Sequence, residues 1–134
     1  MAIMANSAQI IKQTLPSCMV IVDYLNKIDK REREAMKSDL LKLRNELYKN
    51  NIILPLDFGP YGEQLYSDKF NRDISFLNSA GMIEEKVGSI VYQITDRGRE
   101  LDAERSEWYG NIPEDTIAIY DTILSNLIRE IQPQ

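Results

Sequence analysis

The sequence contains no histidine and only one cysteine, Cys18. Without histidine the chain has no Ser-His-Asp or Cys-His catalytic arrangement of its own, and it lacks the commonest metal ligand. One thiol forms no disulfide within the chain and cannot by itself complete a Cys/His zinc site. We therefore expect no metal, no cofactor and no enzyme activity. A site built from tyrosine or carboxylate groups stays open as an alternative.

Long apolar runs and glycine-rich phosphate loops are also missing. No apolar stretch approaches the roughly 20 residues that a membrane-spanning helix needs. Residues 1–13 show no basic segment followed by a long apolar stretch, so we expect no signal peptide and a soluble, cytoplasmic protein. The 134 residues are 43% hydrophobic and 28% charged, with six glycines and five prolines. This composition is typical of one globular domain.

The charge is negative overall but unevenly distributed along the chain. The formal net charge is −5, with a net of +3 in residues 27–50 and −8 in residues 51–134. Strong non-specific DNA binding scales with the number of phosphates neutralised, so this balance disfavours it. A local basic patch on an acidic protein can still bind DNA.

Apolar periodicity predicts five helices and one hairpin in an α+β, mostly α, fold. The helices are expected over residues 17–28, 30–49, 63–80, 96–107 and 113–132. Short segments rich in β-branched and aromatic residues on either side of Gly88-Ser89 indicate a hairpin over residues 82–94. Residues 51–62 read as a connector with a short extended piece at 52–54, and residues 1–16 as a short helix or a loose arm.

Individual residues mark the expected helix ends. Ser17 and Thr95 are expected N-caps, Gly81 is a helix C-terminal glycine, and Pro113 suits a first helical position. Gly98 lies inside the helix expected at 96–107, which leaves the start of that helix open.

Two stretches resemble known families. Residues 72–101, RDISFLNSAGMIEEKVGSIVYQITDRGREL, resemble the winged helix-turn-helix regulators of the MarR and PadR kind. The matching residues are Leu77, Gly81, Met82, Ile83, Tyr92, Ile94, Thr95, Gly98 and Leu101. Residues 57–77, DFGPYGEQLYSDKFNRDISFL, are similar to phage-associated and antitoxin-type winged-helix proteins, including the Panacea domain.

The resemblance implies a single winged-helix domain over residues 1–134, with its core in 17–107 and extra helices at both ends. It also implies a DNA-binding transcriptional regulator. The helix over 63–80 would enter the major groove of double-stranded DNA, and the hairpin over 82–94 would follow the backbone. Arg and Asn are side chains that read base edges. The residues expected to contact DNA are Ser67, Lys69, Asn71, Arg72, Lys86 and Ser89.

The chain departs from a typical DNA-reading member in its charge. Residues 63–79 carry a net charge of −1, and the tip of the expected wing is also acidic. The alternative is therefore a winged-helix protein-interaction module, antitoxin-like or an adaptor, that does not read DNA.

The helix over residues 113–132 has a wide apolar face. Its apolar residues recur at intervals of three and four and include Ile117, Tyr120, Leu124, Leu127 and Ile131. This face packs either on the domain's own core or on a second copy of the chain. We expect a homodimer through it, because two-fold symmetry suits a palindromic DNA site.

Three other features have a functional and a structural interpretation. The basic residues of the helix over 30–49 either bind phosphates or form a solvated face of salt bridges, and the acidic residues between them favour the salt bridges. These basic residues are Lys30, Arg31, Arg33, Lys37, Lys42 and Arg44. Trp108 and Tyr109 either line a ligand pocket or pack at a hinge. Cys18 senses oxidation or, as its apolar neighbours favour, is a small buried hydrophobic residue.

Overall fold

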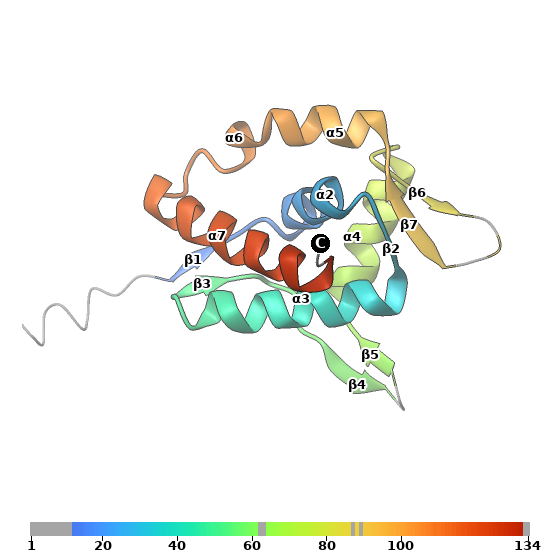
Figure 1. Cartoon of the computed structure of the whole chain (residues 1–134), viewed down its shortest axis with the longest axis horizontal. Coiled ribbons are helices and arrows are strands. Elements are labelled where there is room, and N and C mark those ends of the chain that lie inside the picture. Colours follow the sequence, from blue (N-terminus) through green and yellow to red (C-terminus); the bar gives the residue numbers. More distant parts are fainter. Residues whose placement is uncertain (1–11, 62–63, 87, 89, 133–134) are drawn as a thin grey trace, which may run out of the picture.

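The computed structural model describes residues 12–61, 64–86, 88 and 90–132. In chain order the elements are β1 (Gln13–Thr14), α2 (Ser17–Ile28), β2 (Lys30–Glu32), α3 (Arg33–Tyr48), β3 (Ile52–Ile53), β4 (Gly59–Tyr61), β5 (Gln64–Tyr66), α4 (Asp68–Ser79), β6 (Ile83–Lys86), β7 (Val91–Ile94), α5 (Asp96–Ala103), α6 (Arg105–Trp108) and α7 (Glu114–Ile131). The fold is α+β and mostly helical, as predicted (Figure 1).

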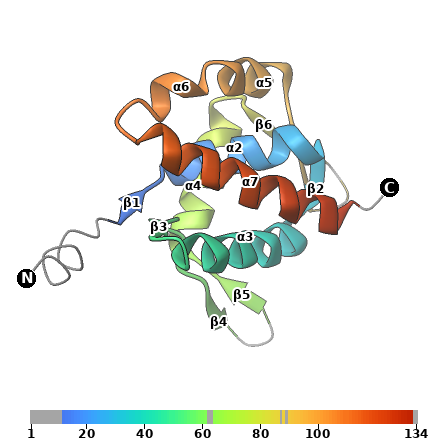
Figure 2. The ribbon, with the colours of Figure 1, turned by 60° about the vertical axis from the view of Figure 1, so that its left-hand side comes forward.

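Helix α2 runs through the middle of the molecule. Helix α3 lies on one side of it, the arm formed by α5 and α6 on the other, and α7 crosses beside α2 and α3 (Figures 1 and 2). Residues 19–25 of α2 are all buried, as expected of a helix that is apolar around most of its circumference. One hydrophobic cluster joins α2 to side chains of every other long helix and of the sheet.

Strands β2, β7 and β6 form an antiparallel sheet in that spatial order. The predicted hairpin over 82–94 is confirmed by β6 and β7, with Ile83 opposite Ile94. The predicted helix over 30–49 was wrong at its start, because residues 30–32 pair with β7 and the helix begins at Arg33. Pairing there covers backbone groups of β7 that would otherwise be an open sheet edge.

A second hairpin replaces the first part of the helix predicted over 63–80. Strands β4 and β5 pair with Gly59 opposite Tyr66, and α4 begins only at Asp68 (Figure 2). Ser67 is the N-cap of α4, because its hydroxyl accepts a hydrogen bond from the backbone N–H of Phe70. The Ser67-Asp68 pair, an N-cap residue followed by an acid in the first turn, was the local signal for this start.

Gly98 sits where α5 lies close to the turn between α4 and β6. A Cβ added at Gly98 would lie 2.2 Å from the carbonyl oxygen of Met82, so glycine is the residue that fits. The helix starts at Asp96 with Thr95 as its N-cap, as predicted. It does not continue to 107 as predicted, because α5 ends at Ala103 and α6 follows as a separate short helix.

The chain enters α2 differently from the sequence prediction. Pro16 occupies the N-cap position, and Ser17 is the first helical residue. The Ser17 hydroxyl donates a hydrogen bond to the Asp73 carboxylate of α4 instead of capping its own helix. Of residues 1–16, those before Lys12 lie outside the described residues, and β1 pairs in parallel with β3.

Candidate nucleic-acid interface

Helix α4 has a core-facing side and a solvent-facing side. Phe70, Ile74 and Leu77 are buried at helical spacing against the central cluster. The outward side carries Lys69, Arg72, Ser75 and Phe76, all exposed, with Asn71 half-buried at its edge. This amphipathic pattern leaves the outward side free to bind a partner.

Ser67 is not part of the outward side, although it was predicted to contact DNA. Its side chain is 2% exposed and its hydroxyl caps the helix. We therefore withdraw Ser67 from the proposed interface, because a buried capping group cannot reach a base edge. The N-cap preference of serine competes directly with its use as a DNA contact.

Lys69 is exposed, but its charge has an internal partner. Its Nζ atom lies 2.9 Å from Oδ1 of Asp73, one turn further along α4. Asp73 is itself buried and also accepts the hydroxyl hydrogen bond from Ser17. The ion pair lowers the net charge that Lys69 offers to a phosphate.

Arg33, the first residue of α3, reaches across to α4. One of its terminal nitrogens donates to Oδ1 of Asn71, and the other lies 3.2 Å from the hydroxyl of Tyr92. Its guanidinium also lies over the ring of Phe70, with 5.9 Å to the ring centroid. Both hydrogen-bond partners are neutral, so Arg33 fixes the Asn71 amide and keeps its own charge.

Arg72 is exposed next to Asn71. Within the described part of the chain, its side chain makes no hydrogen bond or ion pair. Arg72 lines a shallow depression together with Tyr66, Asp68, Asn71 and Ser75. The depression therefore presents the guanidinium of Arg72 and the amide of Asn71 on the solvent-facing side of α4.

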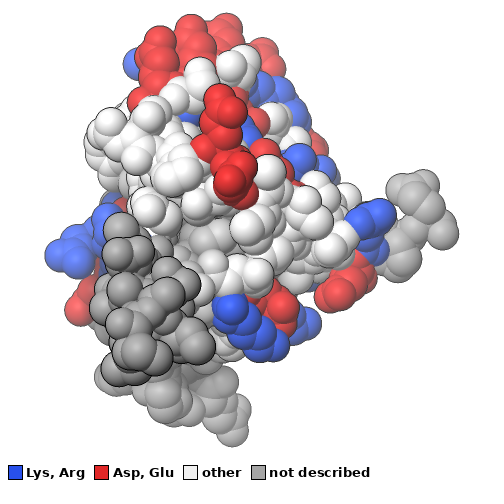
Figure 3. Space-filling view, turned by 90° about the vertical axis from the view of Figure 1, so that its left-hand side faces the viewer, with Lys and Arg blue, Asp and Glu red and all other residues white. Residues whose placement is uncertain are grey.

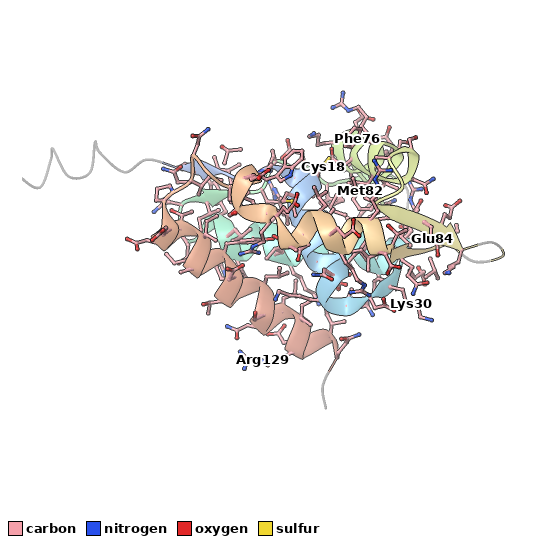
Figure 4. All side chains as sticks on the ribbon, turned by 90° about the horizontal axis from the view of Figure 1, so that it is seen from above. Cys18, Lys30, Phe76, Met82, Glu84 and Arg129 are labelled. Carbon is pink, nitrogen blue, oxygen red and sulfur yellow. The ribbon has the colours of Figure 1, made fainter. Side chains whose placement is uncertain are left out.

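The sheet contributes two further cations. Lys86 of β6 is exposed and lies 2.8 Å from a carboxylate oxygen of Glu84. Lys30 of β2 is exposed and shares a shallow depression with Lys86, Arg31, Glu32 and Val91. Figure 4 shows Lys30 and Glu84 on this side of the molecule. Ser89, the remaining predicted DNA contact, lies outside the described residues.

These groups define what we call the α4 face: Lys30, Arg33, Lys69, Asn71, Arg72 and Lys86. Among the described residues, Lys30, Arg33 and Arg72 have no carboxylate within 4.0 Å, whereas Lys69 and Lys86 each have one. The rest of the predicted basic patch on α3 is largely neutralised, because Arg31 pairs with Asp39, Lys37 with Glu34 and Arg44 with Asp57.

Two carboxyl groups, the buried Asp23 of α2 and the half-buried Asp102 of α5, meet where these two helices pack together. Asp23 is 1% exposed, and its Oδ2 atom accepts hydrogen bonds from the hydroxyls of Tyr109 at 2.7 Å and Tyr120 at 2.6 Å. A nitrogen of Arg105 lies 3.2 Å from the same oxygen. The network ties the centre of α2 to α6 and α7.

The Oδ1 atoms of Asp23 and Asp102 give a physical reason why Asp23 holds a proton. Oδ1 of Asp23 and Oδ1 of Asp102 are both buried, and neither has a hydrogen-bond donor among the described residues. A proton held between the two carboxyl groups satisfies both oxygens. Burial, followed by the neighbouring Asp102 carboxyl, raises the pKa of Asp23 to about 7. The sequence signal for this site was a single aspartate in the apolar run of α2.

Trp108 and Tyr109 were predicted either to line a ligand pocket or to pack at a hinge, and the structure places them differently. Tyr109 is buried in the Asp23 network, which fits packing at a joint. Trp108 is half exposed and borders a small apolar cavity that also contains Cys18. Burial, with the Asp73 carboxylate beside it, raises the pKa of Cys18 to about 12, so the thiol stays protonated and unreactive at neutral pH.

The predicted dimer face of α7 is mostly used inside the chain. Tyr120, Leu124 and Leu127 are buried in the central cluster, and Ile117 and Ile131 are partly buried against it. Tyr120, Leu124 and Leu127 are therefore removed from the predicted dimer interface, because they already pack on α2 and α3. Contact of Ile117 and Ile131 with a second copy stays a prediction. Most of the apolar face of α7 thus belongs to the hydrophobic core of the chain itself.

Comparison of the chain with protein-family models, curated proteins and solved structures finds no match. None of the helices in the described part of the chain combines the length and the apolar character that crossing a membrane requires. The same residues include no group of three or more Cys, Asp or Glu side chains placed to hold a metal ion.

Proposed function

We propose that the chain is a winged-helix protein and that its α4 face binds double-stranded DNA. The support for the fold is the order α2, β2, α3, α4, β6, β7, with β3, β4 and β5 between α3 and α4, together with the sheet order β2–β7–β6. In this arrangement a strand between the first two helices joins the hairpin that follows the third. Helix α4 then takes the place of the recognition helix, and the β6–β7 hairpin takes the place of the wing.

The observation that carries the proposal is the arrangement of Arg33, Asn71 and Arg72. Arg72 is exposed and unpaired among the described residues, and beside it Asn71 is held by the Arg33 hydrogen bond. A guanidinium reads the O6 and N7 acceptors of guanine, and an amide reads adenine. The Asn71 oxygen keeps a second lone pair and its NH₂ group stays free to donate.

The remaining cations of the α4 face fit phosphate contacts. Lys30 and Arg33 have no carboxylate partner among the described residues; Lys30 lies on β2 beside Lys86, and Arg33 contacts Asn71 of α4. Phosphate contacts position a protein on the duplex and carry little sequence information. We assign Arg72 and Asn71 to base edges and Lys30 and Arg33 to the backbone.

The test is fluorescence anisotropy with a labelled duplex of mixed sequence at low salt. Arg72→Ala is expected to weaken binding about tenfold, the lower range for one base-reading or phosphate-binding arginine. The matched control is Lys42→Ala, which removes one exposed cation from α3 outside the α4 face. Equal losses in the two variants would show that only the overall charge matters and would overturn the assignment of Arg72.

A second candidate function is a protein-interaction module. The observation that favours it is the charge of the α4 face, where exposed Glu32, Asp68, Glu84 and Glu85 lie among the cations. This near balance limits how many phosphates the face can neutralise. Absence of any DNA binding at low salt would make this candidate the leading one.

A further inference from the structure

A small apolar cavity opens next to the end of α4, and Phe76 on its rim lies one helical turn beyond Arg72. Its volume is about 60 Å³, and its walls include Cys18, Phe76, Leu77, Met82, Leu101 and Trp108. Figure 4 shows Cys18, Phe76 and Met82 close together, beside the helices α5 and α6. Since a water molecule takes about 30 Å³ in the liquid, the cavity has room for the end of one aliphatic side chain.

Two large aromatic side chains extend this cavity into an apolar groove at the surface. Phe76 is 59% exposed and Trp108 is 50% exposed, and both border the cavity. Burying apolar surface gains about 25 cal/mol per Å², so two aromatic rings left in water are a source of binding energy. We call the cavity and these two rings the apolar groove.

One edge of the apolar groove is acidic. Asp96, Glu100, Glu104 and Glu107 are exposed along α5 and α6, and none of them has a hydrogen-bond or ion-pair partner through its side chain among the described residues. Asp96 and Glu100 are one turn apart on α5, Glu104 lies at the junction of the two helices, and Glu107 follows on α6. Figure 3 shows acidic side chains gathered along the top of the molecule, over this arm.

The basic residues of the same arm do not cancel this stripe. Arg99 is paired with Asp29, and Arg105 is paired with Asp23 and Asp121. Arg97 is the one remaining cation between residues 96 and 108 without an ion pair in the described chain. The unpaired charge of this arm is therefore net negative, with four acidic side chains against Arg97.

We propose that the apolar groove and its acidic edge dock a basic amphipathic helix of a partner protein. An apolar side chain of that helix fills the cavity, and neighbouring apolar residues cover Phe76 and Trp108. Lys or Arg residues on the adjoining side of the helix pair with the acidic stripe. The part of the stripe from Asp96 to Glu104 spans about 12 Å at 1.5 Å per residue, which matches about two helical turns. This surface adjoins the α4 face, because Phe76 lies one helical turn beyond Arg72, but its acidic edge repels DNA.

The chain carries its own reporter for this docking, since Trp108 is its single tryptophan. The probe is a synthetic, tryptophan-free helical peptide with Leu along one face and Lys along the other. The matched peptide has Glu in place of every Lys. We expect the Lys peptide to shift the Trp108 emission to shorter wavelength and to bind at least about tenfold more tightly than the Glu peptide.

Two surface variants locate the contact. The double variant Glu104→Lys, Glu107→Lys is expected to remove most of the preference for the Lys peptide. Its control, Glu114→Lys with Glu130→Lys, makes the same change of net charge on exposed residues of α7 and should keep the preference. Phe76→Ala should weaken the Lys peptide about tenfold, whereas Tyr48→Ala, which removes an exposed aromatic of α3, should not.

Three results would overturn the proposal. Equal binding of the two peptides would remove the role of the acidic stripe. Equal effects of the two charge-reversed variants, or of Phe76→Ala and Tyr48→Ala, would show adsorption without a defined site. A Trp108 emission that shifts with protein concentration alone would assign the apolar groove to a second copy of the chain.

Discussion

The buried carboxyl pair predicts an unusual dependence of stability on pH. In the folded chain the pKa of Asp23 is raised from 3.8 to about 7 by burial and by the adjoining Asp102 carboxyl. Between these two values the folded state holds a proton that the unfolded state has released. The contribution of Asp23 to stability must therefore fall as the pH rises from about 4 to about 7, opposite to the behaviour of a salt-bridged aspartate.

The size of this effect follows from the shift. At 1.36 kcal/mol per pKa unit, the contribution of Asp23 falls by roughly 2.6 kcal/mol between pH 5 and pH 8. Asp23→Asn removes the titration and reproduces the protonated acid, because its oxygen can accept from Tyr109 and Tyr120 and its NH₂ can donate to Asp102. The free energy of unfolding of the variant, relative to the natural chain, should therefore rise by about this amount over the same pH range.

The assay is urea unfolding followed by circular dichroism at pH 5, 6, 7 and 8. Asp57→Asn serves as the control, because the Asp57 carboxylate is at the surface with 95% of its side chain exposed, and its difference from the natural chain should stay nearly constant with pH. If Asp23→Asn follows the natural chain in parallel at every pH, the shared proton is refuted. A natural chain that becomes more stable between pH 5 and pH 7, with Asp23→Asn unchanged relative to it, would refute it equally.

Two further substitutions test the fold around the α4 face. Gly98→Ala should destabilise the chain by about 3 kcal/mol, because the new methyl group meets the Met82 carbonyl oxygen at 2.2 Å and the backbone cannot yield easily. Its control is Gly59→Ala, whose methyl group meets nothing within 4 Å. This variant should cost far less free energy of unfolding in the same urea titration. Ser67→Ala should lower the free energy of unfolding by about 1 kcal/mol through loss of the N-cap. A shift in DNA affinity of Ser67→Ala as large as that of Arg72→Ala would contradict the structural role of Ser67.

Local sequence patterns were enough to predict the elements that depend on apolar spacing and on capping residues close in the chain. The helix over 17–28 was predicted to the residue, and the hairpin after Gly81 and the Thr95 N-cap were also predicted, because spacing and capping act over a few positions. The strand β2 could not be predicted in this way. Its residues have no β pattern of their own and become a strand only because β7, about 60 positions later, offers an edge.

In the candidate site, too, features set by local periodicity could be predicted, and contacts between distant parts of the chain could not. The exposed position of Arg72 follows from the apolar period of α4, but the bond from Arg33 that fixes Asn71 joins residues 38 positions apart. The Asp23 network joins α2 to residues 86 and 97 positions later. The periodicity of α7 correctly indicated an apolar face and could not tell whether a second copy or the chain's own core covers it, since both satisfy the same pattern.

The salt dependence of binding to mixed-sequence duplex DNA tests the central proposal most directly. Two cations of the α4 face, Lys30 and Arg33, are assigned to phosphates, so the logarithm of the binding constant should fall with the logarithm of salt concentration with a slope of about −1.8. A slope near this value, reduced by about one in Arg33→Ala, is the result that the proposal predicts. No binding at low salt, or binding that does not change with salt, would contradict DNA recognition by the α4 face.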